Sequence, residues 1–146
     1  MRDLPRQLSV DELAELFEGK TRFVELLAER EDPLEAAPEV IGELDEADKL
    51  GALNAHPAIG GRGLSPRSAE EQGADADPFV QTELAYLNQV YEEKFGFRFV
   101  VFVDRRPKKE ILEVLRDRLA RVREEELDTG VRELVAIARD RWTRTT

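Results

Sequence analysis

Apolar residues recur with the period of an α-helix along most of this chain, and this period constrains the fold more than any other feature. The clearest case is 78–95, where one apolar stripe runs along the predicted helix through Val80, Leu84, Leu87, Tyr91 and Phe95. Asp77 can cap this segment, and Pro78 suits its first turn. The pattern predicts a helix over 78–95 in a protein built mainly from helices.

Similar signals predict helices elsewhere. Ser9 and Glu12 form an S-x-x-E capping box ahead of an amphipathic stretch. A second amphipathic stretch contains Phe23 and ends near Asp32-Pro33, where a proline disfavours a continuing helix. Further helices are predicted from Pro38 to Leu44, from Asp45 towards Leu53, from Pro107 to Leu119 and over about 124–142, where Asp128-Thr129-Gly130 could interrupt the start.

Two regions break the helical period. Residues 54–68 are rich in glycine and proline and are predicted to form a loop. Residues 96–103 read GFRFVVFV, which propensity alone assigns to a strand. No second convincing strand exists to pair with it, and a lone strand leaves its backbone groups unpaired. We therefore expect an all-α fold, a single compact multi-helix domain over 1–146, with one extended buried segment near 96–103.

Composition excludes several classes of function. The chain has no cysteine, which removes disulfides, thiolate nucleophiles and cysteine-bound zinc. Its formal net charge is −10, whereas proteins that grip phosphate backbones concentrate positive charge, so no nucleic-acid partner is expected. No stretch approaches the roughly 20 apolar residues that span a bilayer, and the N-terminus has no apolar signal region. The expected location is cytoplasmic, with no membrane partner.

His56 is the only histidine and the natural acid or base at neutral pH, because its unperturbed pKa is about 6.5. It follows a predicted helix and precedes Pro57 at the start of the glycine-rich loop. The structural alternative is a charged histidine at a helix C-terminus, which the helix dipole favours. With one histidine and no cysteine, no ligand spacing indicates a metal site.

Ser68 and Glu71 form a second capping box, which on its own is an ordinary helix start. The same geometry also allows a functional interpretation, because a helix N-terminus offers unpaired N–H groups to an anionic ligand. Arg139 and Arg141 in the last predicted helix are the basic candidates. Surface arginines are usually only solvated, but an arginine that reaches into a pocket can bind a substrate carboxylate.

Taken together, these residues resemble the OHCU (2-oxo-4-hydroxy-4-carboxy-5-ureidoimidazoline) decarboxylases over nearly the whole chain. The resemblance rests on five motifs in this order: His56-Pro57, Ser68-x-x-Glu71-Gln72-Gly73-Ala74, Leu87-Asn88-x-x-Tyr91, Lys94-Phe95-Gly96-Phe97-x-Phe99-Val100 and Ile137-Ala138-x-x-Arg141. It implies an all-α fold, usually a homodimer, that forms (S)-allantoin from OHCU in urate breakdown without a metal or organic cofactor.

The resemblance also implies roles for individual residues. His56 corresponds to the catalytic histidine that handles the proton, and Glu71 to its acidic partner. The implied substrate contacts are Pro57, Ser68, Ala69, Glu70, Gln72, the backbone of Phe99, Val100, Val101 and Phe102, and the anion-binding Arg141. The chain departs from the family at Arg98, where many members carry proline, and in shorter stretches around the Ser68 motif.

Two alternatives stay open at the level of sequence. One is a divergent enzyme of the same family that acts on a related ureide or cyclic imide acid, which Arg98 and the short loops would favour. The other is a helical interaction module without activity. Against the second stands the joint presence of His56, Ser68, Glu71, Gln72 and a candidate anion-binding arginine.

Overall fold

The computed structural model describes residues 7–56 and 77–144. Within these residues the chain forms seven α-helices and no strand, which confirms the all-α prediction. The helices are α1 (Val10–Phe17), α2 (Arg22–Ala28), α3 (Pro33–Glu43), α4 (Glu46–Ala55), α6 (Pro78–Phe95), α7 (Lys108–Leu119) and α8 (Arg123–Arg144).

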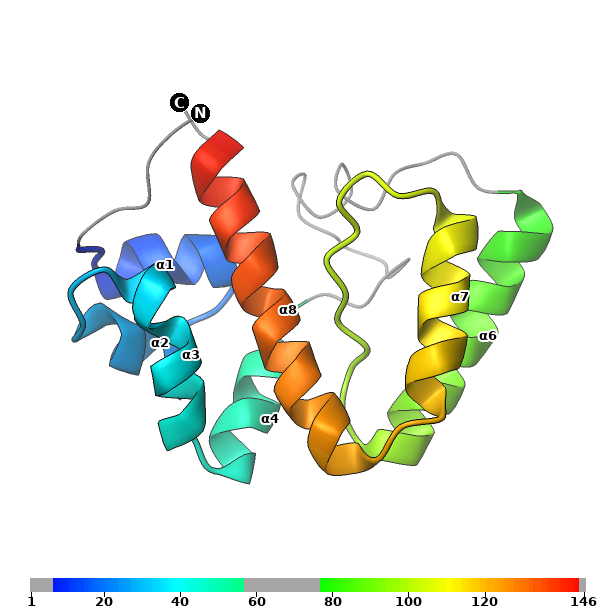
Figure 1. The fold of residues 1–146 in the computed structure, drawn as a ribbon, viewed down its shortest axis with the longest axis horizontal. Coiled ribbons are helices and arrows are strands. Elements are labelled where there is room, and N and C mark those ends of the chain that lie inside the picture. Colours follow the sequence, from blue (N-terminus) through cyan, green and yellow to red (C-terminus); the bar gives the residue numbers. More distant parts are fainter. Residues whose placement is uncertain (1–6, 57–76, 145–146) are drawn as a thin grey trace.

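The long helix α8 runs through the middle of the described structure (Figure 1). It packs against α1, α3 and α4, and α2 joins these helices by contacting α1, α3 and α4. On the other side of α8, helices α6 and α7 lie side by side and run in the same direction (Figure 1). The core therefore sits around α8, with the short N-terminal helices on one side and the α6–α7 pair on the other.

Several helix ends form as the sequence predicts. At α1 the Ser9 hydroxyl accepts from the Glu12 N–H, and the Glu12 carboxylate accepts from the Ser9 N–H, each at 3.1 Å. At α6 the Asp77 carboxylate accepts from the N–H of Phe79 at 2.8 Å, and Pro78 is the first helical residue. Gly96 ends this helix in the left-handed conformation with φ 81°, which glycine adopts without steric cost.

Three predictions about the helices were wrong. Helix α2 ends at Ala28 rather than near Asp32-Pro33. Helix α3 begins at Pro33 rather than at Pro38, because Asp32 turns the chain in a left-handed conformation and Pro33 fits the first helical position. The predicted interruption at 128–130 does not occur, and α8 is continuous. A Cβ at Gly130 would lie 2.7 Å from a methyl carbon of Leu53, so this glycine lets α8 approach α4 closely.

The segment 97–103 is extended and largely buried, as predicted, although it belongs to no sheet. It runs between α8 and the α6–α7 pair and carries the chain back to the start of α7 (Figure 1). Extended chain rises about 3.3 Å per residue against about 1.5 Å in a helix, so a short segment can return along the length of α6. This return allows two consecutive helices to run in the same direction.

Side chains from α7 and α8 form hydrogen bonds with two backbone groups of this segment. Arg118 of α7 donates to the carbonyl of Val100 at 2.6 Å, and the carboxylate of Glu133 in α8 accepts from the N–H of Phe102 at 3.3 Å. The guanidinium of Arg118 also lies 4.6 Å from the ring centre of Phe99. These contacts replace the hydrogen bonds that a neighbouring strand would supply.

A buried polar network ties the same region together. Glu126 of α8 is fully buried, and one carboxylate oxygen accepts from the Tyr91 hydroxyl at 2.6 Å and from Arg118 Nε at 2.7 Å. Its other oxygen accepts from Arg121 at 3.2 Å. Burial first, and then the Glu126 hydrogen bond, raise the pKa of Tyr91, so this phenol stays protonated. The network joins α6, α7 and α8 around the extended segment.

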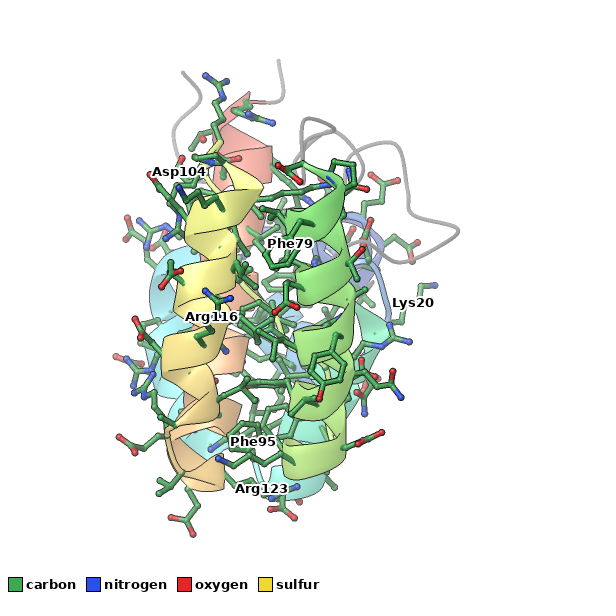
Figure 2. All side chains as sticks on the ribbon, turned by 90° about the vertical axis from the view of Figure 1, so that its right-hand side faces the viewer. Lys20, Phe79, Phe95, Asp104, Arg116 and Arg123 are labelled. Carbon is green, nitrogen blue, oxygen red and sulfur yellow. The ribbon has the colours of Figure 1, made fainter. Side chains whose placement is uncertain are left out.

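A second polar contact closes the far end of these helices. Arg123, at the start of α8, donates through Nε to the carbonyl of Phe95 at 2.8 Å, and Figure 2 shows both residues at the same end of the molecule.

None of the helices in residues 7–56 and 77–144 has the length and apolar character of a membrane span. The cytoplasmic location and the single domain over 1–146 stay predictions.

Candidate functional site

His56 lies at the C-terminal end of α4, in the extended conformation that ends the helix. Its N–H donates to the carbonyl of Leu53 at 3.2 Å, and only 7% of the residue is exposed. The ring Nδ1 is buried and has no hydrogen-bond partner among the described residues. An unsatisfied buried nitrogen is rare in folded proteins and needs an explanation, of which a functional role is one.

The surroundings of His56 disfavour its protonated form. Its pKa is lowered to about 4: burial is the main cause, the positive charges of Arg141 and Arg98 act in the same direction, and the carboxylate of Glu18 opposes them. The imidazole is therefore neutral at pH 7. This lowered pKa disfavours the structural alternative, a charged histidine at a helix C-terminus, because burial removes the hydration of the charged ring. A neutral imidazole can accept a proton.

Arg141 of α8 lies next to this histidine, whereas Arg139 is exposed. Only 3% of Arg141 is exposed. Its Nη1 donates to the carbonyl of Leu16 at 2.8 Å, and its Nη2 lies 3.7 Å from Glu18 Oε1. Of the two predicted basic candidates, Arg141 is thus the one that the fold brings to His56.

Glu18 is a residue of this cluster that the sequence analysis missed. It follows the last turn of α1, and its Oε2 lies 3.9 Å from Nδ1 of His56. The next residue, Gly19, lies so near the end of α4 that a Cβ there would be 2.9 Å from the Cβ of Ala55. A glycine just after a predicted helix was the available signal, because it marks a close approach or a turn.

Arg98, the departure from the family pattern, also reaches this cluster. Its Nη1 donates to the carbonyl of His56 at 2.6 Å. Proline at this position could make no such contact, since its side chain has no donor. Arg98 therefore connects the extended segment to the residue that ends α4.

The other predicted site residues fall into two groups. Six of them lie outside the described residues: Pro57, Ser68, Ala69, Glu70, Glu71 and Gln72. The remaining four lie in the extended segment, where Phe99, Val100 and Val101 are buried and Phe102 is half-buried. The backbone N–H of Phe102, an expected substrate contact, already donates to Glu133.

Asn88, which belongs to one of the motifs behind the resemblance, is also buried in α6. Its Oδ1 is the other buried side-chain atom without a hydrogen-bond partner among the described residues. Within the same residues, no three histidine, aspartate or glutamate side chains gather as a metal site would require.

The chain is similar in sequence to curated proteins. The chain is 33% identical over 106 residues to the 2-oxo-4-hydroxy-4-carboxy-5-ureidoimidazoline decarboxylase of Xenopus laevis. This match covers 66% of this chain and 61% of that protein. It is 32% identical over 109 residues to the protein of the same description from Halalkalicoccus jeotgali, and this match covers 71% of this chain and 62% of that protein. The chain thus spans about three fifths of the length of these curated relatives.

A solved structure shares the fold. The crystal structure of an OHCU decarboxylase in the presence of (S)-allantoin superposes with a TM-score of 0.74 at 23% identity, covering 90% of this chain and 94% of that one. The family model described as OHCU decarboxylase matches residues 2–143. Because this match covers nearly the whole sequence, the chain belongs to the OHCU decarboxylase family.

Proposed function

We propose that the protein decarboxylates OHCU to (S)-allantoin in urate degradation, without a metal or organic cofactor. Membership of the family supports the substrate class. The observation that carries the proposal is a buried, neutral His56 beside the buried guanidinium of Arg141. A proton acceptor next to an anion-binding group is what the decarboxylation of a carboxylate needs.

The chemistry of the substrate makes an added cofactor unnecessary. One ring carbon carries both the carboxylate and the hydroxyl, and its neighbour, which bears the ureido group, is doubly bonded to a ring nitrogen. When the bond to the carboxylate breaks, its electron pair forms a double bond between the two carbons and moves the imine pair onto nitrogen, which takes up a proton. Carbon dioxide leaves, and the substrate itself acts as the electron sink.

His56 would transfer the proton that completes the reaction. Its neutral ring accepts the hydroxyl proton as that carbon becomes a carbonyl, and the imidazolium then donates to the ureido-bearing carbon. Donation to one face of the ring gives one enantiomer of allantoin. The net reaction takes up one proton for each carboxylate lost.

The remaining residues would bind and orient the ring. Arg141 would hold the negative charge of the substrate, and Glu71 would act as the acidic partner of His56. Other expected contacts are Pro57, Ser68, Ala69, Glu70, Gln72 and the backbone from Phe99 through Val100 and Val101 to Phe102. These assignments rest on the family resemblance.

The test is turnover of freshly generated OHCU, followed by circular dichroism of the allantoin formed. The natural protein should accelerate decarboxylation and yield a single enantiomer, and His56→Asn should lose roughly 100-fold or more of that rate, as is usual for a general acid or base. Glu71→Gln keeps the size of the side chain but removes its negative charge, so it tests whether turnover depends on that charge. Arg141→Lys should raise KM, whereas Arg139→Lys, at the exposed neighbouring position, should not. Unchanged turnover in a folded His56→Asn variant would rule out its role.

Arg98 favours one second candidate, a related ureide or cyclic imide acid as the substrate, because it adds a cation near His56 that many family members lack. A panel of such acids, compared by kcat/KM with OHCU, separates the two. A higher kcat/KM for another acid would transfer the assignment to it.

We also propose a homodimer, since the family usually forms one. Light scattering across a range of protein concentrations measures the mass directly. A mass of 16.6 kDa, that of one chain, at all concentrations would contradict this.

A further inference from the structure

The carboxylate of Glu18 lies between the two groups that the proposed function uses. Its Oε2 is 3.9 Å from Nδ1 of His56, and its Oε1 is 3.7 Å from Nη2 of Arg141. All three side chains are mostly shielded from solvent. One carboxylate thus faces both the candidate proton carrier and the candidate anion-binding group.

Glu18 adopts a backbone conformation that glutamate seldom takes. Its φ of 60° and ψ of 35° are left-handed, and its N–H closes the end of α1 by donating to the carbonyl of Ala14. Glycine is the usual residue in such a position because it has no Cβ to clash. Strain of this kind collects at functional sites, and here it accompanies a carboxylate placed between His56 and Arg141.

The backbone around Glu18 is also fixed in place. Gly19 packs directly against Ala55, the last residue of α4, and His56 follows Ala55. Arg141 donates to the carbonyl of Leu16 in α1. The end of α1 is therefore held against both elements that carry the candidate catalytic groups, so the Glu18 carboxylate has little freedom to move away.

The charges around His56 favour a role for this carboxylate in turnover. Arg98 from the extended segment and Arg141 from α8 face the imidazole with positive charge, and Glu18 from the end of α1 faces it with negative charge. An imidazolium formed beside two guanidiniums needs a nearby anion. Among the described residues, Glu18 is the acid within 4 Å of the ring.

We propose that Glu18 is a positioning residue, which orients the His56 imidazole through Nδ1 and holds Arg141 with its second oxygen. The inference rests on the proposed role of His56. The 3.9 Å separation exceeds a hydrogen bond, and it would shorten by about 1 Å when the ring becomes protonated, since such contacts are often long before substrate binds. With Nδ1–H directed at Glu18, Nε2 is the nitrogen that exchanges protons with the substrate.

Because the chain has one histidine, nitrogen-15 NMR of the uniformly labelled protein reports the His56 tautomer without ambiguity. At pH 7 the natural protein should show a neutral ring with the proton on Nδ1. Glu18→Gly removes the carboxylate and also the backbone strain. The relieved strain offsets part of the cost of leaving the buried Arg141 without this anion, and the folded variant should lose the tautomer preference and roughly 10- to 100-fold in kcat. Glu18→Gln, which keeps an acceptor, should restore the tautomer and only part of kcat.

The control is Glu15→Gln, an exposed change on α1, which should alter neither measurement. A folded Glu18→Gly variant with unchanged tautomer would overturn the inference, and so would one with unchanged kcat. The NMR measurement needs no substrate, so it remains decisive for the orientation of His56 even if the natural protein does not turn over OHCU. Failure of the natural protein to turn over OHCU would instead refute the proposed function.

Discussion

Removing the negative charge of Glu126 should destabilise the protein more than any change on its surface. This carboxylate is fully buried and accepts hydrogen bonds from Tyr91, Arg118 and Arg121. Glu126→Gln keeps the size of the side chain but leaves the buried guanidinium of Arg118 without its anion. It also places an amide N–H₂ where one of the two acceptors stood.

The structure sets the magnitude of this effect. Breaking a buried ion pair by removing one partner costs about 3–5 kcal/mol, because the remaining charge stays desolvated and unpaired. The free energy of unfolding of a small domain is only about 5–15 kcal/mol. A loss of this size should lower Tm by roughly 10 °C in a chain of this length. Glu125→Gln is the matched control, since Glu125 is exposed and lies 3.7 Å from Arg121, and its change should stay within about 0.5 kcal/mol.

Urea unfolding followed by far-UV circular dichroism measures both variants against the natural protein. The midpoint for Glu126→Gln should fall with little change in slope. A loss below about 1 kcal/mol would refute the reasoning, because it would mean that Arg118 finds another partner or solvent. The same variant should also raise KM for OHCU, since Arg118 holds the carbonyl of Val100 in the extended segment.

Four further predictions concern stability. Gly130→Ala should cost about 1–3 kcal/mol, because its Cβ would meet Leu53 at 2.7 Å. Gly51→Ala should instead stabilise α4 by about 0.5–1 kcal/mol, because a Cβ there would have no atom within 4 Å. Equal changes in the free energy of unfolding for the two glycine variants, measured in urea, would contradict the packing argument. Ser9→Ala should cost about 1 kcal/mol by removing one half of the capping box, again by urea unfolding. The folded pKa of His56 is about 4, below its unfolded value near 6.5, so protonation favours unfolding. The contribution of neutral His56 to the free energy of unfolding is complete above pH 6.5 and disappears as the pH falls to 4. The natural protein should lose about 3 kcal/mol more than His56→Gln over that window, and parallel pH profiles would refute the assignment.

Local sequence determines most of the helices. The apolar stripe and the Asp77-Pro78 start define α6, and Gly96 ends it, because these signals act between residues a few positions apart. The same applies to the Ser9 capping box of α1. Such short-range contacts are already specified before the chain packs.

Local rules fail where packing between distant elements competes with them. Gly130 lies in a stretch that resembles a helix break, yet α8 continues through it because the glycine accommodates Leu53 of α4. The extended segment shows both sides of this limit. Its lack of a partner strand is visible in the sequence, but Arg118 and Glu133, which satisfy its backbone, become neighbours only in the folded chain.

The candidate site divides in the same way. Residue type alone identified His56, because a single imidazole is the natural proton carrier at neutral pH, and the family motif added Arg141. Only the tertiary structure brought Glu18 and Arg98 to that histidine, and burial together with Arg141 and Arg98 lowered its pKa. Periodicity reports which residues share the face of one helix. The neighbours and pKa of His56 depend instead on how the ends of α1 and α4 pack against α8, and no spacing within one helix encodes that packing.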